Sequence, residues 1–152
     1  MRWIVLILSC LSLAGCVGVE VANHEEPIDR YQNTIAPILE AWKLVVHDWE
    51  KAASIEKSDP DRASDAKSAQ TRMQNIIASW DSVSAPDKLR EYHLWMRHAM
   101  DYEKEAFRVM AEYYSFGYEP DPNELKRLRN LATELWVMKD KALLKADDAL
   151  HK

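Results

Sequence analysis

Apolar residues recur every three to four positions from Pro27 to the end of the chain, which is the period of one face of an α-helix. The pattern falls into four blocks, separated by proline-containing breaks at residues 58–60, 84–86 and 118–122. Each break also holds a serine or aspartate that can cap a new helix. No strand-like alternation interrupts the blocks, so the spacing predicts an all-α fold.

The four blocks predict an antiparallel up-down-up-down four-helix bundle, because their connections are short. Helices of roughly 20–30 residues would each be about 30–45 Å long at 1.5 Å per residue. The second block is the most polar, and a long three-helix arrangement is the alternative if that block is poorly formed. Pro37 lies inside the first block and is expected to kink its helix or to begin a new segment.

The first sixteen residues follow a different pattern. Arg2 supplies a positive charge, residues 3–13 are an almost unbroken apolar run, and Ala14 and Gly15 are small. The run is too short to cross a bilayer as a permanent helix, which takes ~20 apolar residues. It is therefore expected to be an export signal that is removed. An ordinary secretory signal with a different boundary and an uncleaved anchor are the alternatives.

The end of this segment, Leu13-Ala14-Gly15-Cys16, resembles the lipobox of bacterial lipoprotein precursors. The resemblance implies cleavage before Cys16 and a covalent diacylglycerol and N-acyl lipid on that cysteine. It divides the chain into a signal peptide (1–15), a lipidated cysteine with a short tether (16–26) and a helical bundle domain (27–152). It also implies a cell-envelope protein, lipid-anchored on the extracytoplasmic side of the outer membrane or the plasma membrane.

Composition narrows the partners that the mature domain can have. Cys10 lies in the leader and Cys16 carries the lipid, so neither a disulfide nor a cysteine-based catalytic or zinc site is expected. The formal net charge is −5, and an acidic domain offers no electrostatic footprint for nucleic acid or an anionic lipid surface. The lipid anchor is therefore expected to hold the protein to the membrane, as a monomer or a weak dimer.

Each block predicts a helix with one apolar face, which we call its stripe. Three polar residues lie within these stripes and form a candidate polar core cluster. Glu103 lies near the centre of the third stripe, Lys139 near the centre of the fourth, and Gln70 just off the centre of the second. Antiparallel packing places Gln70 at about the height of Glu103 and Lys139 roughly 7 Å away along the axis, within the reach of two long side chains. The cluster is expected to be either a polar pocket or an internal ion pair that fixes helix register. In the second case, Glu103→Ala would leave the ammonium of Lys139 without a partner.

The spacing of the histidines bears on whether the bundle could hold a metal ion. No glutamate stands three positions before His47, His93 or His98, so the Glu-x-x-His pairs of dinuclear bundles are missing. His93, Met96 and Met100 share one helix face, and imidazole with thioethers suits Cu(I). The same methionines are ordinary core residues. No metal is therefore assigned, and these three residues are only weak candidates.

The sequence contains no nucleophile elbow and no glycine-rich phosphate loop, so no catalytic residue is assigned and an enzyme is not expected. The expected function is a helical binding or scaffolding module of the cell envelope, whose partner would be another envelope protein. The alternative is a carrier of a small molecule or of copper in the bundle interior.

The aromatic turn at residues 113–120 is expected to cover the end of the core, with Gly117 as a C-cap, or else to bind a partner.

Overall fold

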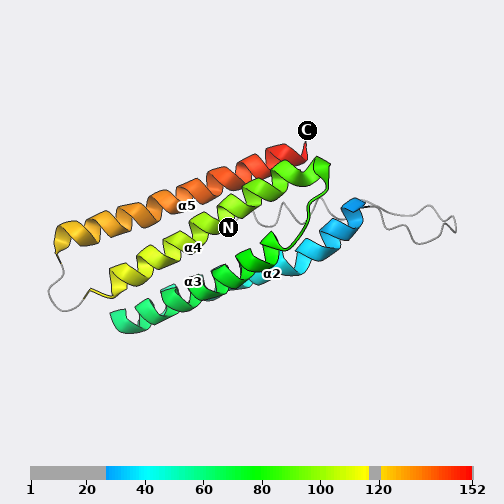
Figure 1. Cartoon of the computed structure of the whole chain (residues 1–152). Coiled ribbons are helices and arrows are strands. Elements are labelled where there is room, and N and C mark those ends of the chain that lie inside the picture. The colour runs from blue at the N-terminus through cyan, green and yellow to red at the C-terminus, as the bar shows by residue number, and fades with distance from the viewer. Residues whose placement is uncertain (1–26, 117–120, 152) are drawn as a thin grey trace.

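The computed structural model describes residues 27–116 and 121–151 of the chain. Four long helices account for most of them: α2 (Pro27–Ser54), α3 (Asp59–Asp81), α4 (Arg90–Tyr114) and α5 (Pro122–Leu150) (Figure 1). A short 3-10 helix at Asp87–Leu89 leads into α4. The described residues contain no strand, and the predicted all-α four-helix bundle is confirmed. The predicted signal peptide, Cys16 and the tether lie outside the described residues.

Local capping explains where two of the helices begin. The Ser58 hydroxyl accepts a hydrogen bond from the Asp61 backbone N–H at the start of α3, with Pro60 in the first turn. The Asp121 carboxylate accepts one from the Asn123 N–H at 2.9 Å at the start of α5. Both side chains satisfy backbone donors that have no partner inside the helix. The polar second block thus forms a full helix of 23 residues, which removes the three-helix alternative.

Pro37 does not begin a new segment. Helix α2 runs without interruption from Pro27 to Ser54, with Pro37 inside it. Tyr31 and Ile35 precede the proline and Trp42 and Val45 follow it, and all four are buried. Burial on both sides of the proline offsets the backbone hydrogen bond that proline cannot donate.

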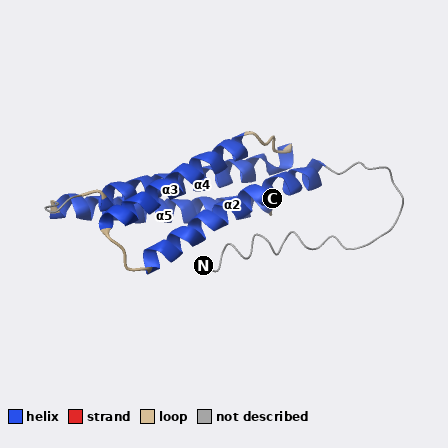
Figure 2. Ribbon diagram, turned by 90° about the horizontal axis from the view of Figure 1, so that it is seen from below, coloured by secondary structure: helices blue, strands red, loops and turns tan. Residues whose placement is uncertain are grey.

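The helices run along a common direction, with connecting loops at both ends (Figure 2). Helices adjacent in sequence pack on one another, and the most extensive contact is between α4 and α5. The start of α2 and the end of α5 lie at the same end of the bundle (Figure 1). Among the described residues, no helix combines the length and the apolar character of a membrane-spanning segment.

One hydrophobic cluster draws residues from all four helices, and a smaller one joins α4 and α5 around Val109 and Leu128. Helix α4 contributes the most buried residues and is the centre of the bundle. Alanines are frequent on the facing sides of α4 and α5, and short side chains let two helices approach closely. The buried ones are Ala99, Ala106, Ala111, Ala132, Ala142, Ala146 and Ala149. Within the described residues, Glu103 is the one charged residue in this buried set.

Candidate functional site

Glu103 occupies the interior position that the helical spacing predicts. Its residue exposure is 2%, between buried turns of α4 that carry Met100 and Phe107. A carboxylate at such a position needs compensating charge or hydrogen bonds, because transfer of an ion from water to the interior is strongly unfavourable. Glu103 is therefore the position from which the polar site is built.

Lys139 of α5 supplies the compensating charge. Its Nζ lies 3.0 Å from Glu103 Oε2, so the predicted ion pair is present. The two partners differ in exposure, since 19% of the Lys139 side chain and 3% of the Glu103 side chain reach the surface. Lys139 Nζ is also 3.7 Å from Asp140 Oδ1. The ammonium thus keeps contact with solvent and with a second carboxylate, whereas Glu103 depends on the pair.

The second partner of Glu103 is Trp136. Its indole Nε1 donates a hydrogen bond to Glu103 Oε1 at 3.2 Å. The other oxygen, Oε2, has no well-aligned hydrogen bond within the described residues, so its contact with Lys139 is mainly ionic. Gln70 is partly exposed on α3, and no hydrogen bond in the described part of the chain links it to Glu103 or Lys139. The site therefore consists of Glu103, Lys139 and Trp136.

The position of Trp136 in the sequence was a partial signal for this role. It lies three residues before Lys139, on the same side of α5, at the flank of the apolar stripe. An indole at a stripe flank carries an N–H that needs an acceptor when it is buried. The sequence shows this need but not which acceptor meets it, because that depends on the rotation of α5 against α4.

Burial dominates the electrostatics of the site. It raises the pKa of Glu103 above its ordinary value of 4.5, and the positive charge of Lys139 and the hydrogen bond from Trp136 act in the opposite direction. The negative charge of Asp140 adds a further small rise to this pKa. Glu103 is therefore easier to protonate in the folded protein than in the unfolded chain. One buried acid and one lysine can exchange a proton, but they do not by themselves define a reaction.

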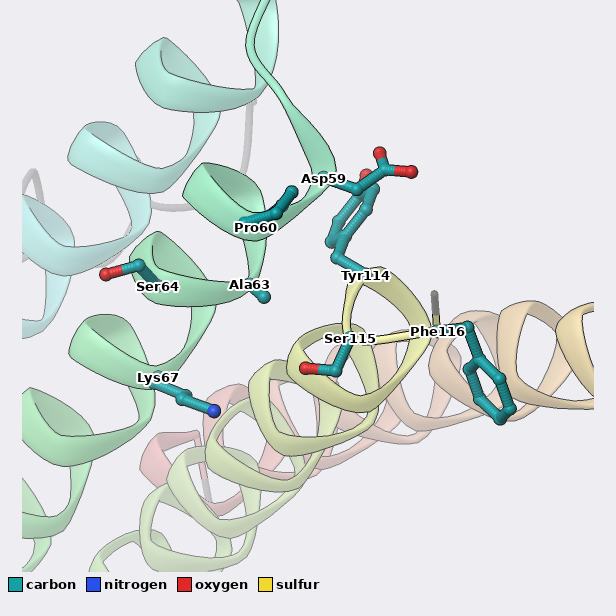
Figure 3. Close-up of a pocket in the computed structure, with 8 residues that line it drawn as sticks. All are labelled: Asp59, Pro60, Ala63, Ser64, Lys67, Tyr114, Ser115 and Phe116. Carbon is teal, nitrogen blue, oxygen red and sulfur yellow. The ribbon is translucent and has the colours of Figure 1, made fainter. Parts of the chain in front are cut away.

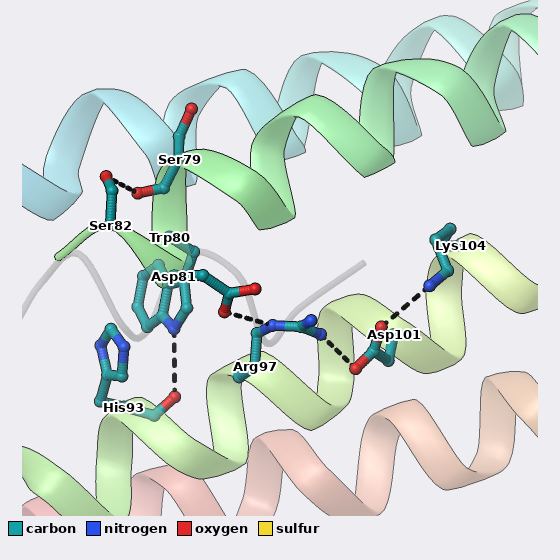
Figure 4. A network of polar contacts seen from close by, with 8 residues as sticks. All are labelled: Ser79, Trp80, Asp81, Ser82, His93, Arg97, Asp101 and Lys104. Carbon is teal, nitrogen blue, oxygen red and sulfur yellow. Dashed lines mark hydrogen bonds and ion pairs between the residues drawn. The ribbon is translucent and has the colours of Figure 1, made fainter.

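His93, one of the weak metal candidates, lies in a different polar network, whose contacts between α3 and α4 are drawn in Figure 4. Its ring stacks on Trp80 of α3 with centroids 4.5 Å apart, and its carbonyl accepts a hydrogen bond from Trp80 Nε1 at 3.2 Å. Its Nδ1 lies 2.9 Å from the Tyr31 hydroxyl of α2. Burial lowers the pKa of His93, and the nearby charge of Asp81 opposes that shift. His93 thus connects α2, α3 and α4.

Met96 and Met100, the other weak copper candidates, are buried at 2% and 0% exposure in the large hydrophobic cluster. Their thioethers pack in the interior, while Nδ1 of His93 is engaged by Tyr31. The described residues also contain no group of three or more His, Cys, Asp or Glu side chains that could hold a metal ion. The arrangement of these three residues is accounted for by packing and by helix–helix contacts.

Arg97 forms the outer part of the same network. Its guanidinium pairs with Asp81 of α3 at 2.5 Å and with Asp101 on its own helix. Lys104 adds a contact to Asp101 at 3.0 Å (Figure 4). Each of these groups is at least a quarter exposed, so the cluster is expected to help hold α3 against α4 with a modest contribution to stability.

An open surface hollow lies at the other end of α4, between its last turn and the start of α3 (Figure 3). Its volume is about 640 Å³, and Lys67 reaches into it from α3 opposite Ser115 and Tyr114. Its charged lining residues, Asp59 and Lys67, are both exposed. The hollow is about 16 Å along α4 from Glu103. None of its described lining residues is a buried polar group that would select a ligand.

The aromatic turn at the end of α4 mainly covers the core. Tyr113 and Phe116 are partly buried against the small cluster around Val109 and Leu128. Tyr114 packs beneath the Arg62 guanidinium, 5.6 Å from its ring centroid. The predicted C-cap at position 117 lies outside the described residues. The described aromatic residues thus support the covering role.

Comparison of the chain with protein-family models, with curated proteins and with solved structures finds no match. Any functional conclusion therefore depends on the residues and the geometry of this chain.

Proposed function

We propose that the chain is a lipid-anchored protein of the cell envelope, whose helical bundle is a binding or scaffolding module on the extracytoplasmic side. The observation that carries this proposal is the sequence Leu13-Ala14-Gly15-Cys16 directly after an apolar run that begins behind Arg2. Two or more acyl chains on Cys16 would give stable anchoring at ~0.8 kcal/mol per buried methylene, whereas one chain would be marginal.

The start of the folded domain is compatible with a membrane anchor. Helix α2 begins at Pro27, so residues 17–26 separate it from Cys16. Even fully extended at about 3.5 Å per residue, ten residues keep the domain within roughly 35 Å of the lipid surface. The bundle would therefore work close to its membrane, with the start of α2 and the end of α5 at the tethered end.

The packing of the bundle supports a binding or scaffolding role more than a carrier role. The interior is filled by apolar side chains from all four helices, and Glu103, the one buried charge among the described residues, is paired with Lys139. Helix α5 has 29 residues, which corresponds to about 43 Å at 1.5 Å per residue. A packed rod of this length offers long outer helix faces to a partner.

Mass spectrometry of the protein isolated from a bacterial host tests the anchor. The wild-type chain, expressed with its leader, is expected to yield an N-terminal peptide that begins at a lipid-modified Cys16 and to partition into detergent. Cys16→Ser is expected to abolish both the modification and the cleavage, because the lipid is attached through the thiol. Cys10→Ser removes the other cysteine of the leader and is the matched control, which should keep both. An unmodified Cys16 thiol in the mature wild-type protein would refute the anchor.

A further inference from the structure

The outer face of α5 carries a row of charges with alternating sign. Arg127, Glu134, Lys141 and Asp148 follow one another at intervals of seven residues. Seven residues are close to two helical turns, so the four side chains form one row with steps of about 10.5 Å. All four residues are exposed, and none belongs to the buried stripe of α5. Arg127 lies on the flank next to α4, where the charge of Glu112 also acts on it. We call Arg127, Glu134, Lys141 and Asp148 the α5 charge row.

Three members of the row have no ionic partner in the fold. Within the described residues, no ion pair is formed by Glu134, Lys141 or Asp148, and Arg127 pairs only with Glu124 on its own helix. Other charged side chains, such as the exposed Arg108 and the partly buried Arg97, pair with two carboxylates each. Glu134, Lys141 and Asp148 are therefore available to groups outside the molecule, whereas Arg127 would have to share its guanidinium with Glu124.

An apolar pair lies beside the row. Val137 and Leu144 are each 48% exposed and also stand seven residues apart, next to Lys141. Isolated exposed apolar residues are common on protein surfaces. Here the two residues form a second row parallel to the charges, which is the pattern of a helix that packs against another helix.

We propose that this face of α5 binds a second copy of the same chain, with the two α5 helices antiparallel. A twofold axis just after Val137 places Lys141 opposite Glu134 of the second copy, and Asp148 opposite its Arg127. Symmetry repeats both pairs, so the whole charge row meets opposite charges. Val137 then meets its own counterpart at the centre. A parallel arrangement in the same register would place each charged residue opposite the same residue of the second copy, and like charges repel.

The expected contact is small. The row spans 21 residues, or about 32 Å, and a helix with its side chains is about 10 Å wide. The contact therefore buries far less than the ~1,200 Å² at which stable interfaces begin. Association is weak and reversible, so it is best detected by cross-linking. It is a property of the folded domain and does not rest on lipid attachment.

Single-cysteine cross-linking tests the contact. The full-length chain, with Cys10 and Cys16 replaced by serine, is purified in mild detergent, and Val137→Cys is treated with a short bis-maleimide. Leu94→Cys is the matched control, because Leu94 is 51% exposed on α4. We expect Val137→Cys to give about fivefold more covalent dimer than Leu94→Cys. Equal yields from the two variants would overturn the proposal.

Charge reversal tests the antiparallel register in the Val137→Cys background. Lys141→Glu places two carboxylates opposite each other at both symmetric positions, so we expect dimer yield to fall about fivefold. Adding Glu134→Lys exchanges the two charges and should restore the yield. Lys51→Glu on α2 changes the net charge by the same amount and should have no effect. The register is wrong if Lys141→Glu leaves the yield unchanged, if the exchange fails to restore it, or if Lys51→Glu lowers it equally.

Discussion

Replacing Lys139 by methionine removes the counter-charge of Glu103 and keeps a side chain of similar length. The Glu103 side chain is 3% exposed and its Oε2 has only the ionic contact with Lys139. After the substitution the carboxylate must either stay ionised in the interior or take up a proton. The second outcome is expected, because neutralisation of a buried acid is less unfavourable than burial of an isolated ion.

The free energy of protonation sets the size of the effect. Glu103 has an ordinary pKa of 4.5, so protonation at pH 7 spans about 2.5 pH units at about 1.36 kcal/mol each, or about 3.4 kcal/mol. This value is an upper limit on the electrostatic cost, and we expect Lys139→Met to lower the free energy of unfolding by about 2–3 kcal/mol near pH 7. Glu103→Gln should lower the free energy of unfolding by only about 1 kcal/mol. The ammonium of Lys139 is still in contact with solvent and with Asp140 in this variant, and the amide oxygen of glutamine can still accept the hydrogen bond from Trp136.

The pH dependence has a defined sign. The pKa of Glu103 is raised by folding, so between its unfolded and folded pKa values the folded state binds more protons than the unfolded state. Its contribution to stability is fully present below the unfolded pKa and is lost as pH rises through the folded pKa. Loss of the positive charge of Lys139 raises the folded-state pKa of Glu103 further, so the pH range between the unfolded and folded pKa values extends upward. The destabilisation caused by Lys139→Met should therefore shrink as pH falls from about 7 to about 5.

Urea unfolding followed by far-UV circular dichroism measures these differences for wild type, Lys139→Met, Glu103→Gln and the double variant. The double variant should be more stable near neutral pH than Lys139→Met alone, since it contains no stranded carboxylate. Two results would contradict this expectation: equal stability of the two single variants, or an effect of Lys139→Met that does not change with pH. Either result would mean that Glu103 does not depend on Lys139.

Two further variants test local contacts by thermal unfolding. Asp121→Ala removes the cap that accepts from the Asn123 N–H and should cost about 1 kcal/mol. Asp59→Ala is its control and should change stability by only a few tenths, because the cap of α3 is the preceding serine. Tyr31→Phe deletes the hydroxyl that contacts His93 Nδ1 and should also cost about 1 kcal/mol; an unchanged unfolding temperature would show that this contact does not hold α2 to α4.

The helices themselves were predictable because their determinants are local. Proline and capping residues act within a turn of the backbone, so the breaks near Pro60 and Pro122 mark real helix starts. Helical spacing also assigns Leu150, seven residues after Leu143, to the apolar face of the fourth block. This prediction is wrong, because Ala149 is buried there and Leu150 is 39% exposed. Hydrophobicity favours leucine at such a position, but the close approach of α5 to α4 leaves room for the smaller side chain.

The sequence predicts how far along the bundle each residue of the candidate site lies, but not which way its side chain points. Counting residues along antiparallel helices places Lys139 roughly 7 Å from Glu103 along the axis, within the reach of two long side chains, and the two side chains meet at 3.0 Å. The same counting gives Gln70 a similar height but not its direction. Whether a side chain faces a partner depends on how each helix is turned about its own axis, which many side chains set together. For the same reason, the spacing alone did not show that Lys139 retains solvent.

Lipid anchoring and antiparallel pairing together predict how the bundle lies on a membrane. Helix α5 ends at Leu150, at the end of the bundle where α2 begins (Figure 1). In the proposed pair, the twofold axis lies just after Val137, and the end of α5 lies about 19 Å from it. The two proposed tethers would therefore start about 38 Å apart, one at each end of the pair.

Tethers of ten residues reach at most about 35 Å, so both lipids enter one bilayer most readily when the helix axes lie along its surface. Polarised infrared spectroscopy of the lipidated protein on oriented bilayers measures this angle from the amide I dichroism. Wild type should show helices parallel to the membrane plane, and Lys141→Glu, which breaks the pair, should lose that preference. Helices along the membrane normal in a protein that still cross-links at position 137 would show that the two proposals do not act together.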